Sequence, residues 1–334
     1  MFCCYFIRKF ILIIVVNFFY RCYTDLYEFY LFRMMSTRKE YVYMGLDNSK
    51  IAIVVDSCAD LSKEMQEQYN ICVIPMMIQC EDGEYRDGVD ITIEEIYERL
   101  KTEIPKTSTP SGETIDATFA DLKNQGYEKV LAVMVSGGIS STVNHVRLAA
   151  EDSGMEACVI DSLSGSIGHG AVAIQASVWR QEGMAFEDIC KKAESLCKNT
   201  KVFFSIDTLE YLQRGGRIGK VTALVGTALN IKPVLTFDAE GELSTAAKVR
   251  GHKLVEKKLL SLVGECVSLP EYQGRRYNLM VADGGIREER DAIEAKMKEM
   301  YPNFNMMIPS RVEGILGIYL GPGMLGAGIQ FLDD

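Results

Sequence analysis

Two arginines flank a pair of glycines near the middle of the chain, in the run Leu-Gln-Arg-Gly-Gly-Arg-Ile-Gly at 212–219. The guanidinium groups of Arg214 and Arg217 can each bind a carboxylate or phosphate through two parallel hydrogen bonds. The glycines between them allow successive backbone amides to point at one anion. The run therefore predicts an anion-binding loop. A surface turn with solvated arginines is the competing interpretation.

Hydroxyl-rich turns offer further ligands for an anion. They are Thr107-Ser108 and the run from Ser136 to Thr142, in which Ser140, Ser141 and Thr142 open a predicted helix. Free amides and the helix dipole favour a bound carboxylate or phosphate at such a position. Serine and threonine are also ordinary helix caps, so any one of these turns alone is more often a cap than a binding site. Their convergence with Thr107-Ser108 makes the two interpretations about equal.

Strands and helices alternate from residue 51 to residue 198. Apolar, β-branched runs predict strands at 51–55, 71–78, 130–135 and 157–160, and amphipathic runs predict helices at 62–69, 92–101, 113–124, 140–151, 169–182 and 186–198. This order is typical of an α/β domain with a mostly parallel sheet and helices on both faces. Asp56-Ser57, the turn after residue 135 and Asp161-Ser162 all follow strands, so we expect them at one edge of the sheet, where ligands of such folds bind.

The pattern changes near residue 200. Strands are predicted at 202–206, 231–237, 242–249, 277–282, 305–308 and 317–320, with a hairpin turn at 238–241 and helices at 253–262 and 288–300. This predicts a second, α+β domain with a mixed or antiparallel sheet. We divide the chain into an extension (1–48), an N-terminal domain (49–199) and a C-terminal domain (200–334).

The extension is crowded with aromatic and aliphatic residues, and its apolar core at 10–20 follows Arg8 and Lys9. This arrangement resembles the start of an export signal, but a small-residue cleavage site is absent and the apolar run is too short for a membrane span. Two interpretations remain open: a true anchor, or an upstream start preceding Met34, Met35 or Met44.

Composition excludes several classes of protein. The formal net charge is −10, and the acidic excess lies beyond residue 50, which disfavours nucleic acids and anionic membrane surfaces as partners. The ten cysteines show no metal-ligand spacing, so we expect no metal. The folded body is expected to be cytoplasmic without stable membrane insertion.

No phosphate-binding loop GxxxxGK[ST] and no GxSxG elbow occur in the sequence. The GxGxxG match at 321–326 lies too late in the chain to open a dinucleotide-binding unit.

Six segments in order resemble the successive signatures of the DegV family. They are 51–61, 106–111, 136–142, 209–233, 248–250 and Gly-Pro-Gly at 321–323. The resemblance runs from about residue 50 to the end and leaves the extension unmatched.

The resemblance implies a non-enzymatic protein that binds a long-chain fatty acid between two α/β domains and needs no other cofactor. The carboxylate of the fatty acid would be held by Ser/Thr hydroxyls. In this chain the residues at the matching positions, with their immediate neighbours, are Thr107, Ser108, Ser140 and Ser141. Arg217 and Arg250 resemble the family's arginines near the head group and the partner surface. Such proteins can present the acid to a separate ATP-dependent fatty acid kinase that makes acyl phosphate for phospholipid synthesis. Chain length and saturation of the acid are not set by these motifs.

Two positions depart from the family pattern. Ser141 stands where the family usually has glycine, and Tyr319 stands where carrier members often have histidine. A phenol donates a hydrogen bond but is neutral at pH 7, so binding is better supported than phosphoryl transfer. The alternative from another class is a small-molecule enzyme, a phosphotransferase or hydrolase, acting on an anionic substrate at the same site.

Overall fold

The structure is a computed structural model that describes residues 48–224 and 231–333. The predicted extension up to residue 47, with Met34, Met35 and Met44, lies outside the described residues, as does Asn230 of the 209–233 segment. No described helix is long and apolar enough to cross a membrane. The described residues belong to one compact unit. The predicted division at 199/200 falls inside this unit, between a helix and a strand, and stays a prediction.

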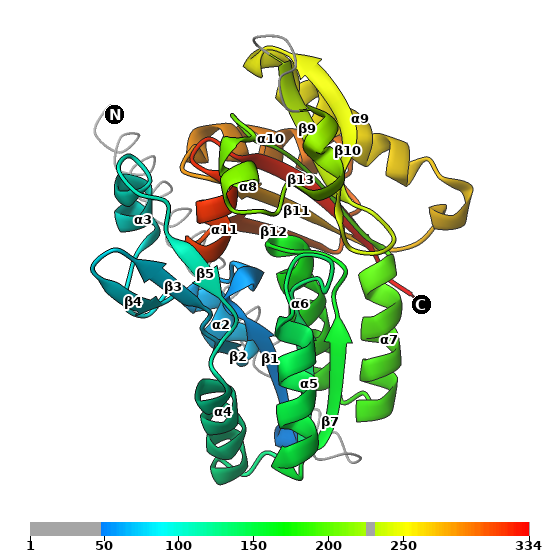
Figure 1. The fold of residues 1–334 in the computed structure, drawn as a ribbon. Coiled ribbons are helices and arrows are strands. Elements are labelled where there is room, and N and C mark those ends of the chain that lie inside the picture. Colours follow the sequence, from blue (N-terminus) through cyan, green and yellow to red (C-terminus); the bar gives the residue numbers. More distant parts are fainter. Residues whose placement is uncertain (1–47, 225–230, 334) are drawn as a thin grey trace, which may run out of the picture. The chain divides into compact units, whose positions relative to one another are not determined.

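Four parallel strands make the first sheet, in the order β2-β1-β6-β7. All six residues of β1 are buried, as expected for a strand covered on both faces, which reads as a continuous apolar run. Helices α4 and α5 pack on one face, and α6 and α7 pack on the other (Figure 1). This arrangement confirms the predicted parallel α/β architecture. The elements are β1 (Ile51–Asp56), β2 (Ile71–Ile74), β6 (Lys129–Met134), β7 (Glu156–Asp161), α2 (Lys63–Tyr69), α4 (Gly112–Asn124), α5 (Thr142–Ser153), α6 (Ile167–Gln181) and α7 (Phe186–Lys198).

Six strands make the second sheet, in the order β10-β9-β8-β13-β11-β12. Strands β11 and β12 pair in parallel and the other neighbouring pairs are antiparallel, so the predicted mixed sheet is confirmed. Helices α9 and α10 cover one face, and α6 lies against the other (Figure 1). The elements are β8 (Thr200–Ser205), β9 (Ile231–Phe237), β10 (Leu243–Arg250), β11 (Tyr277–Asp283), β12 (Met306–Arg311), β13 (Leu325–Phe331), α9 (Val255–Val267) and α10 (Arg287–Met300).

Two strand predictions are wrong. The run 71–78 divides at Pro75 into β2 and β3 (Met77–Cys80), which join different sheets, because proline lacks an amide hydrogen and restricts the residue before it. Residues 317–320 lie in helix α11 (Gly314–Leu320), and the last described strand is β13. A short apolar run fits a buried helix and a buried strand equally well, so the pattern alone could not separate them.

A small antiparallel sheet, in the order β4-β3-β5, accompanies the two larger ones. Its strands are β3, β4 (Gly83–Arg86) and β5 (Lys106–Ser108), and α3 (Ile93–Arg99) follows β4 in the chain. Helix α11 contacts both α3 and α8 (Glu210–Arg214). Because β5 carries Thr107, this sheet positions one of the predicted site residues.

Helix α6 lies between the two larger sheets and joins their cores. Thirteen of its 15 residues are buried, and it contacts β1 and β6 of the first sheet and β8 and β11 of the second. One hydrophobic cluster accordingly contains residues of both sheets, such as Ile53 and Met280. A helix that is apolar on all sides is typical of the interior of a large protein.

Asp56 ties the end of β1 to the end of β6. Its carboxylate accepts hydrogen bonds from the backbone N–H groups of Cys58 (3.0 Å) and Val135 (2.8 Å), and the side chain is fully buried. We expect Asp56→Ala to lower the free energy of unfolding by roughly 2–5 kcal/mol, because each buried donor left without a partner costs about 1–3 kcal/mol. Urea denaturation measures this change. Asp90→Ala is the control, since Asp90 pairs with Arg86 on the surface; equal losses in both variants would contradict the role of Asp56.

Candidate functional site

A cavity opens where the carboxyl ends of the first sheet's strands approach the second sheet. It holds about 850 Å³ of space between atoms, including the part open to solvent. Side chains from β8, β9, α6 and α11 make its wall predominantly apolar, among them Phe204, Phe237, Ile167 and Ile315. The cavity therefore suits a ligand with a large apolar part.

Four polar side chains that line this cavity lie close together, and we call them the polar rim: Thr107, Ser140, Arg217 and Tyr319. They come from β5, the loop before α5, the loop after α8, and α11. Arg217 is exposed and Thr107 and Ser140 are half-buried, whereas Tyr319 is only 8% exposed. The rim brings together residues that are more than 200 positions apart in the chain.

Contacts within the rim hold its members in place. The hydroxyl groups of Thr107 and Tyr319 are hydrogen-bonded to each other. The Arg217 guanidinium lies 5.2 Å from the centre of the Tyr319 ring, a cation–π arrangement. Its nitrogens also donate to the carbonyl oxygens of Ile139 (3.4 Å) and Gly215 (3.0 Å). Arg217 is thus oriented by an aromatic face and by two backbone groups.

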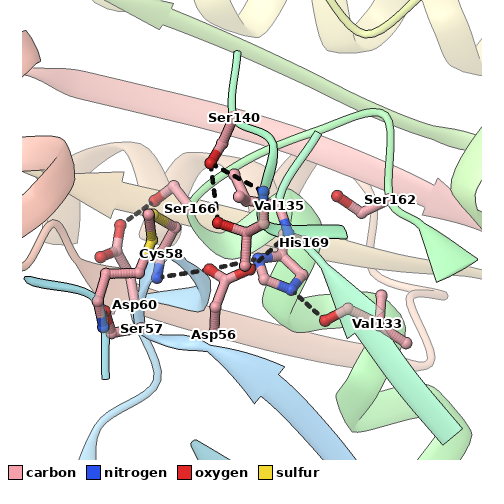
Figure 2. A network of polar contacts seen from close by, with 12 residues as sticks. Asp56, Ser57, Cys58, Asp60, Val133, Val135, Ser140, Ser162, Ser166 and His169 are labelled. Carbon is pink, nitrogen blue, oxygen red and sulfur yellow. Dashed lines mark hydrogen bonds and ion pairs between the residues drawn. The ribbon is translucent and has the colours of Figure 1, made fainter. Parts of the chain in front are cut away.

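Ser140 lies at the start of helix α5. Its Oγ is 2.8 Å from Oγ1 of Thr142 and accepts a hydrogen bond from the Thr142 amide (3.3 Å), and Figure 2 shows it beside the network around Asp56 and Ser166. A helix N-terminus favours an anion. Three hydroxyl groups and one guanidinium therefore give the rim the donors that a carboxylate needs. Among the described residues no three His, Cys, Asp or Glu side chains could share a metal ion.

Three predicted residues lie outside the cavity lining. Ser108 and Ser141 are exposed neighbours of lining residues, and Arg250 is exposed at the end of β10. The structure therefore brings together Thr107 and Tyr319 with two of the other predicted ligands, Ser140 and Arg217, but not these three.

The strand-end turns share one edge of the first sheet, but most of their polar groups bind the protein itself. Ser136 Oγ donates to the Gly241 carbonyl oxygen (2.7 Å). The Asp161 carboxylate accepts from the Gly137 amide (3.1 Å) and, like Asp56, fixes the backbone of a neighbouring turn. These residues position the rim rather than face the cavity.

A second polar group on the cavity wall, Ser166 and Cys58, carries no recognisable signal in the sequence. Ser166 precedes α6 with a positive φ of 53° and a ψ of −142°, and its hydroxyl donates to Asp60 Oδ2 (2.6 Å; Figure 2). Asp60 has a left-handed conformation, with φ of 50°. Backbone strain of this kind persists only where the surroundings enforce it, and a sequence pattern does not report it for residues other than glycine.

A second hollow lies on the far side of Asp60. It holds about 1200 Å³, again including open solvent, and its lining includes Asp60, Asp87 and Glu313. Burial raises the pKa of Asp87 to about 6 and that of Glu313 to about 7. Burial also raises the pKa of Asp60 well above its usual range, against hydrogen bonds from Ser166 and from the Glu313 amide. Near neutral pH this acidic cluster therefore carries less negative charge than its composition indicates.

Sequence comparison places the chain beside bacterial relatives. The model of the DegV family, described as a family of uncharacterised proteins, matches residues 50–332. A DegV domain-containing protein of Clostridium acetobutylicum is 34% identical over 281 residues, which are 83% of this chain and 97% of that protein. One from Clostridium perfringens is also 34% identical, over 84% of this chain and 98% of the relative.

Solved structures resemble the fold over the same region. A DegV family protein of Thermus thermophilus, described by its fatty acid binding, has a TM-score of 0.78 at 29% identity and covers 85% of this chain and 100% of its own. The fatty acid binding DegV of Bacillus subtilis has a TM-score of 0.75 at 29% identity, covering 84% and 99%. A stearic acid-binding protein of Eubacterium ventriosum has a TM-score of 0.75 at 26% identity, covering 84% and 98%.

Proposed function

This chain belongs to the DegV family, and on that premise we propose that it binds a long-chain fatty acid, with the alkyl chain in the apolar cavity and the carboxylate at the polar rim. The observation that carries the proposal is the combination of a predominantly apolar wall with donors gathered on one side. The fatty acid binding described for the similar Thermus and Bacillus proteins supports it.

The energetics of such a ligand fit the two parts of the cavity. Burying a CH₂ group contributes roughly 0.8 kcal/mol, so an alkyl chain of about 15 carbons contributes on the order of 10 kcal/mol before the costs of binding. A carboxylate loses its hydration on entering a pocket and needs donors in exchange. The rim offers the hydroxyls of Thr107, Ser140 and Tyr319 and the guanidinium of Arg217.

We further propose that the protein presents the bound acid to a separate ATP-dependent kinase and is not itself an enzyme. The sequence holds no GxxxxGK[ST] loop for ATP, and the exposed Arg217 lies next to the proposed carboxylate position. Tyr319 makes this role the weaker half of the proposal, because its hydroxyl is engaged with Thr107 and a phenol is neutral near pH 7.

Native mass spectrometry of the purified protein tests the binding function. We expect a co-purified mass of a C14 to C18 fatty acid, because a cavity of this character retains an acid of that size in water. Delipidated protein should take up the same acid when it is added back. A protein that carries no lipid, takes up none and hydrolyses an ester or a phosphate would instead support the small-molecule enzyme.

Ser140→Ala tests the placement of the carboxylate. Loss of one hydrogen bond to a charged group is expected to weaken fatty acid binding by roughly 1.5–3 kcal/mol, measured by titration of the delipidated protein. Ser153→Ala is the matched control, since Ser153 lies at the other end of α5, away from the cavity. Unchanged affinity in Ser140→Ala would count against the assigned rim.

Arg250→Ala tests the proposed presentation to a kinase. Arg250 is exposed and outside the cavity lining, so we expect fatty acid affinity to stay nearly unchanged while acyl-phosphate formation with a partner kinase falls. Arg147→Ala, which removes another exposed arginine on α5, should affect neither measurement. Equal losses of binding and of phosphorylation in Arg250→Ala would contradict this role.

A further inference from the structure

Two tyrosine rings pack reciprocally against two glycines beside the cavity. The Tyr211 ring of α8 lies against Gly321, which follows α11, and the Tyr319 ring of α11 lies against Gly215, which follows α8. A Cβ atom on either glycine would come within 3.0 Å of the facing ring, closer than real Cβ atoms approach other atoms. We call these four residues the tyrosine clasp. It explains one glycine in each of the two glycine-rich motifs of the sequence.

At Gly215 the facing ring is the reason for glycine, and the backbone is not. Its φ of −77° and ψ of −4° are right-handed helical values, which alanine adopts more readily than glycine. Gly216 is the opposite case, with φ of 71° and no atom within 4 Å of the place that a Cβ atom would occupy. The adjacent glycines of one motif therefore serve two different purposes.

The clasp determines where the Tyr319 ring and its hydroxyl lie. The ring lies against the backbone of Gly215 and 5.2 Å from the Arg217 guanidinium, and its hydroxyl is hydrogen-bonded to Thr107 on β5. A side chain at position 215 would push the ring away from this place. Both the hydroxyl and the aromatic face that orients Arg217 would then move out of the rim.

We propose that Gly215 is a positioning residue for carboxylate recognition, acting through the Tyr319 ring. This inference rests on the proposed fatty acid binding and adds to it the source of selectivity for an acid over a neutral lipid. Gly215 does not line the cavity, so its substitution acts on the lining only through the Tyr319 side chain and leaves residues such as Phe204 and Ile167 in place. What changes is the set of donors around the acid group.

Gly215→Ala is tested by the affinities of the delipidated protein for hexadecanoic acid and for hexadecan-1-ol. Acid affinity is expected to fall roughly tenfold or more, the loss that follows when a charged group gives up one hydrogen bond. Alcohol affinity is expected to fall much less, because most of the apolar wall is unchanged and a neutral head group depends less on the displaced donors, so the ratio of the two affinities drops. An unchanged ratio would overturn the positioning role.

Two further comparisons separate positioning from general destabilisation. Gly126→Ala is expected to lower thermal stability, because Gly126 has a φ of 91° with no atom near the place of a Cβ atom, but to keep the acid-to-alcohol ratio of the wild type, since Gly126 does not line the cavity. In a Tyr319→Phe background, Gly215→Ala is expected to reduce the ratio by less than in the wild type, because the hydroxyl that it displaces is already absent and only the aromatic face beside Arg217 is left to move. Fully additive losses would refute an action through Tyr319.

If Gly215→Ala does not fold, Tyr211→Leu loosens the clasp from its other side, since Tyr211 is not part of the cavity lining. It is expected to lower the same ratio, and an unchanged ratio would overturn the clasp. A wild-type protein that binds neither lipid would refute the proposed function itself. A wild type that binds the acid while the clasp variants keep its selectivity would refute only this inference.

Discussion

The buried helix α6 is the constraint on which the rest of the structure depends. Its burial on nearly all sides requires both larger sheets to present apolar faces to it, and the shared hydrophobic cluster is the result. Close approach is part of this packing: a Cβ atom at Gly170 would lie 2.5 Å from the carbonyl oxygen of Ala59. Because protein interiors are densely packed, the helix fixes the distance between the sheets along its length.

The cavity lies at the N-terminal end of α6, where this helix no longer occupies the space between the sheets. Ile167, the first residue of α6, lines it, and Ser166 just before the helix lies on its wall. Beyond this point helix α11 and loops from distant parts of the chain enclose the space. Leu163 and Ser166 both have positive φ, and with Asp60 they show that the backbone around the helix entry is held in a strained form by its surroundings. Regular elements thus create the void, and its polar side chains come from loops as well as from β5 and α11.

Much of this architecture could be predicted from residue pattern because the responsible forces are local. Strand β1 follows directly from its unbroken apolar run, and the β9–β10 hairpin follows from the turn chemistry at 238–241. Pro75 is a local signal against a single strand over 71–78, whereas the run before Gly321 is ambiguous between helix and strand on any local argument. For the site, sequence motifs identify four residues that line the cavity: Thr107, Ser140, Arg217 and Tyr319. They do not identify Ser166 and Cys58, because no local pattern tells which residues of a fold border a void.

The position of β13 has a consequence for how the protein is made. Although β13 comes after all other described strands in sequence, it lies in the interior of its sheet, between β8 and β11, and it contributes Gly326 and Ala327 to the cavity wall. A ribosome-bound nascent chain that has not yet released residues 325–331 has a gap in the middle of that sheet. Synthesis proceeds from the N-terminus at a limited rate, and earlier domains fold first. The cavity is therefore completed only after translation has passed these residues, because a shorter chain lacks part of its wall.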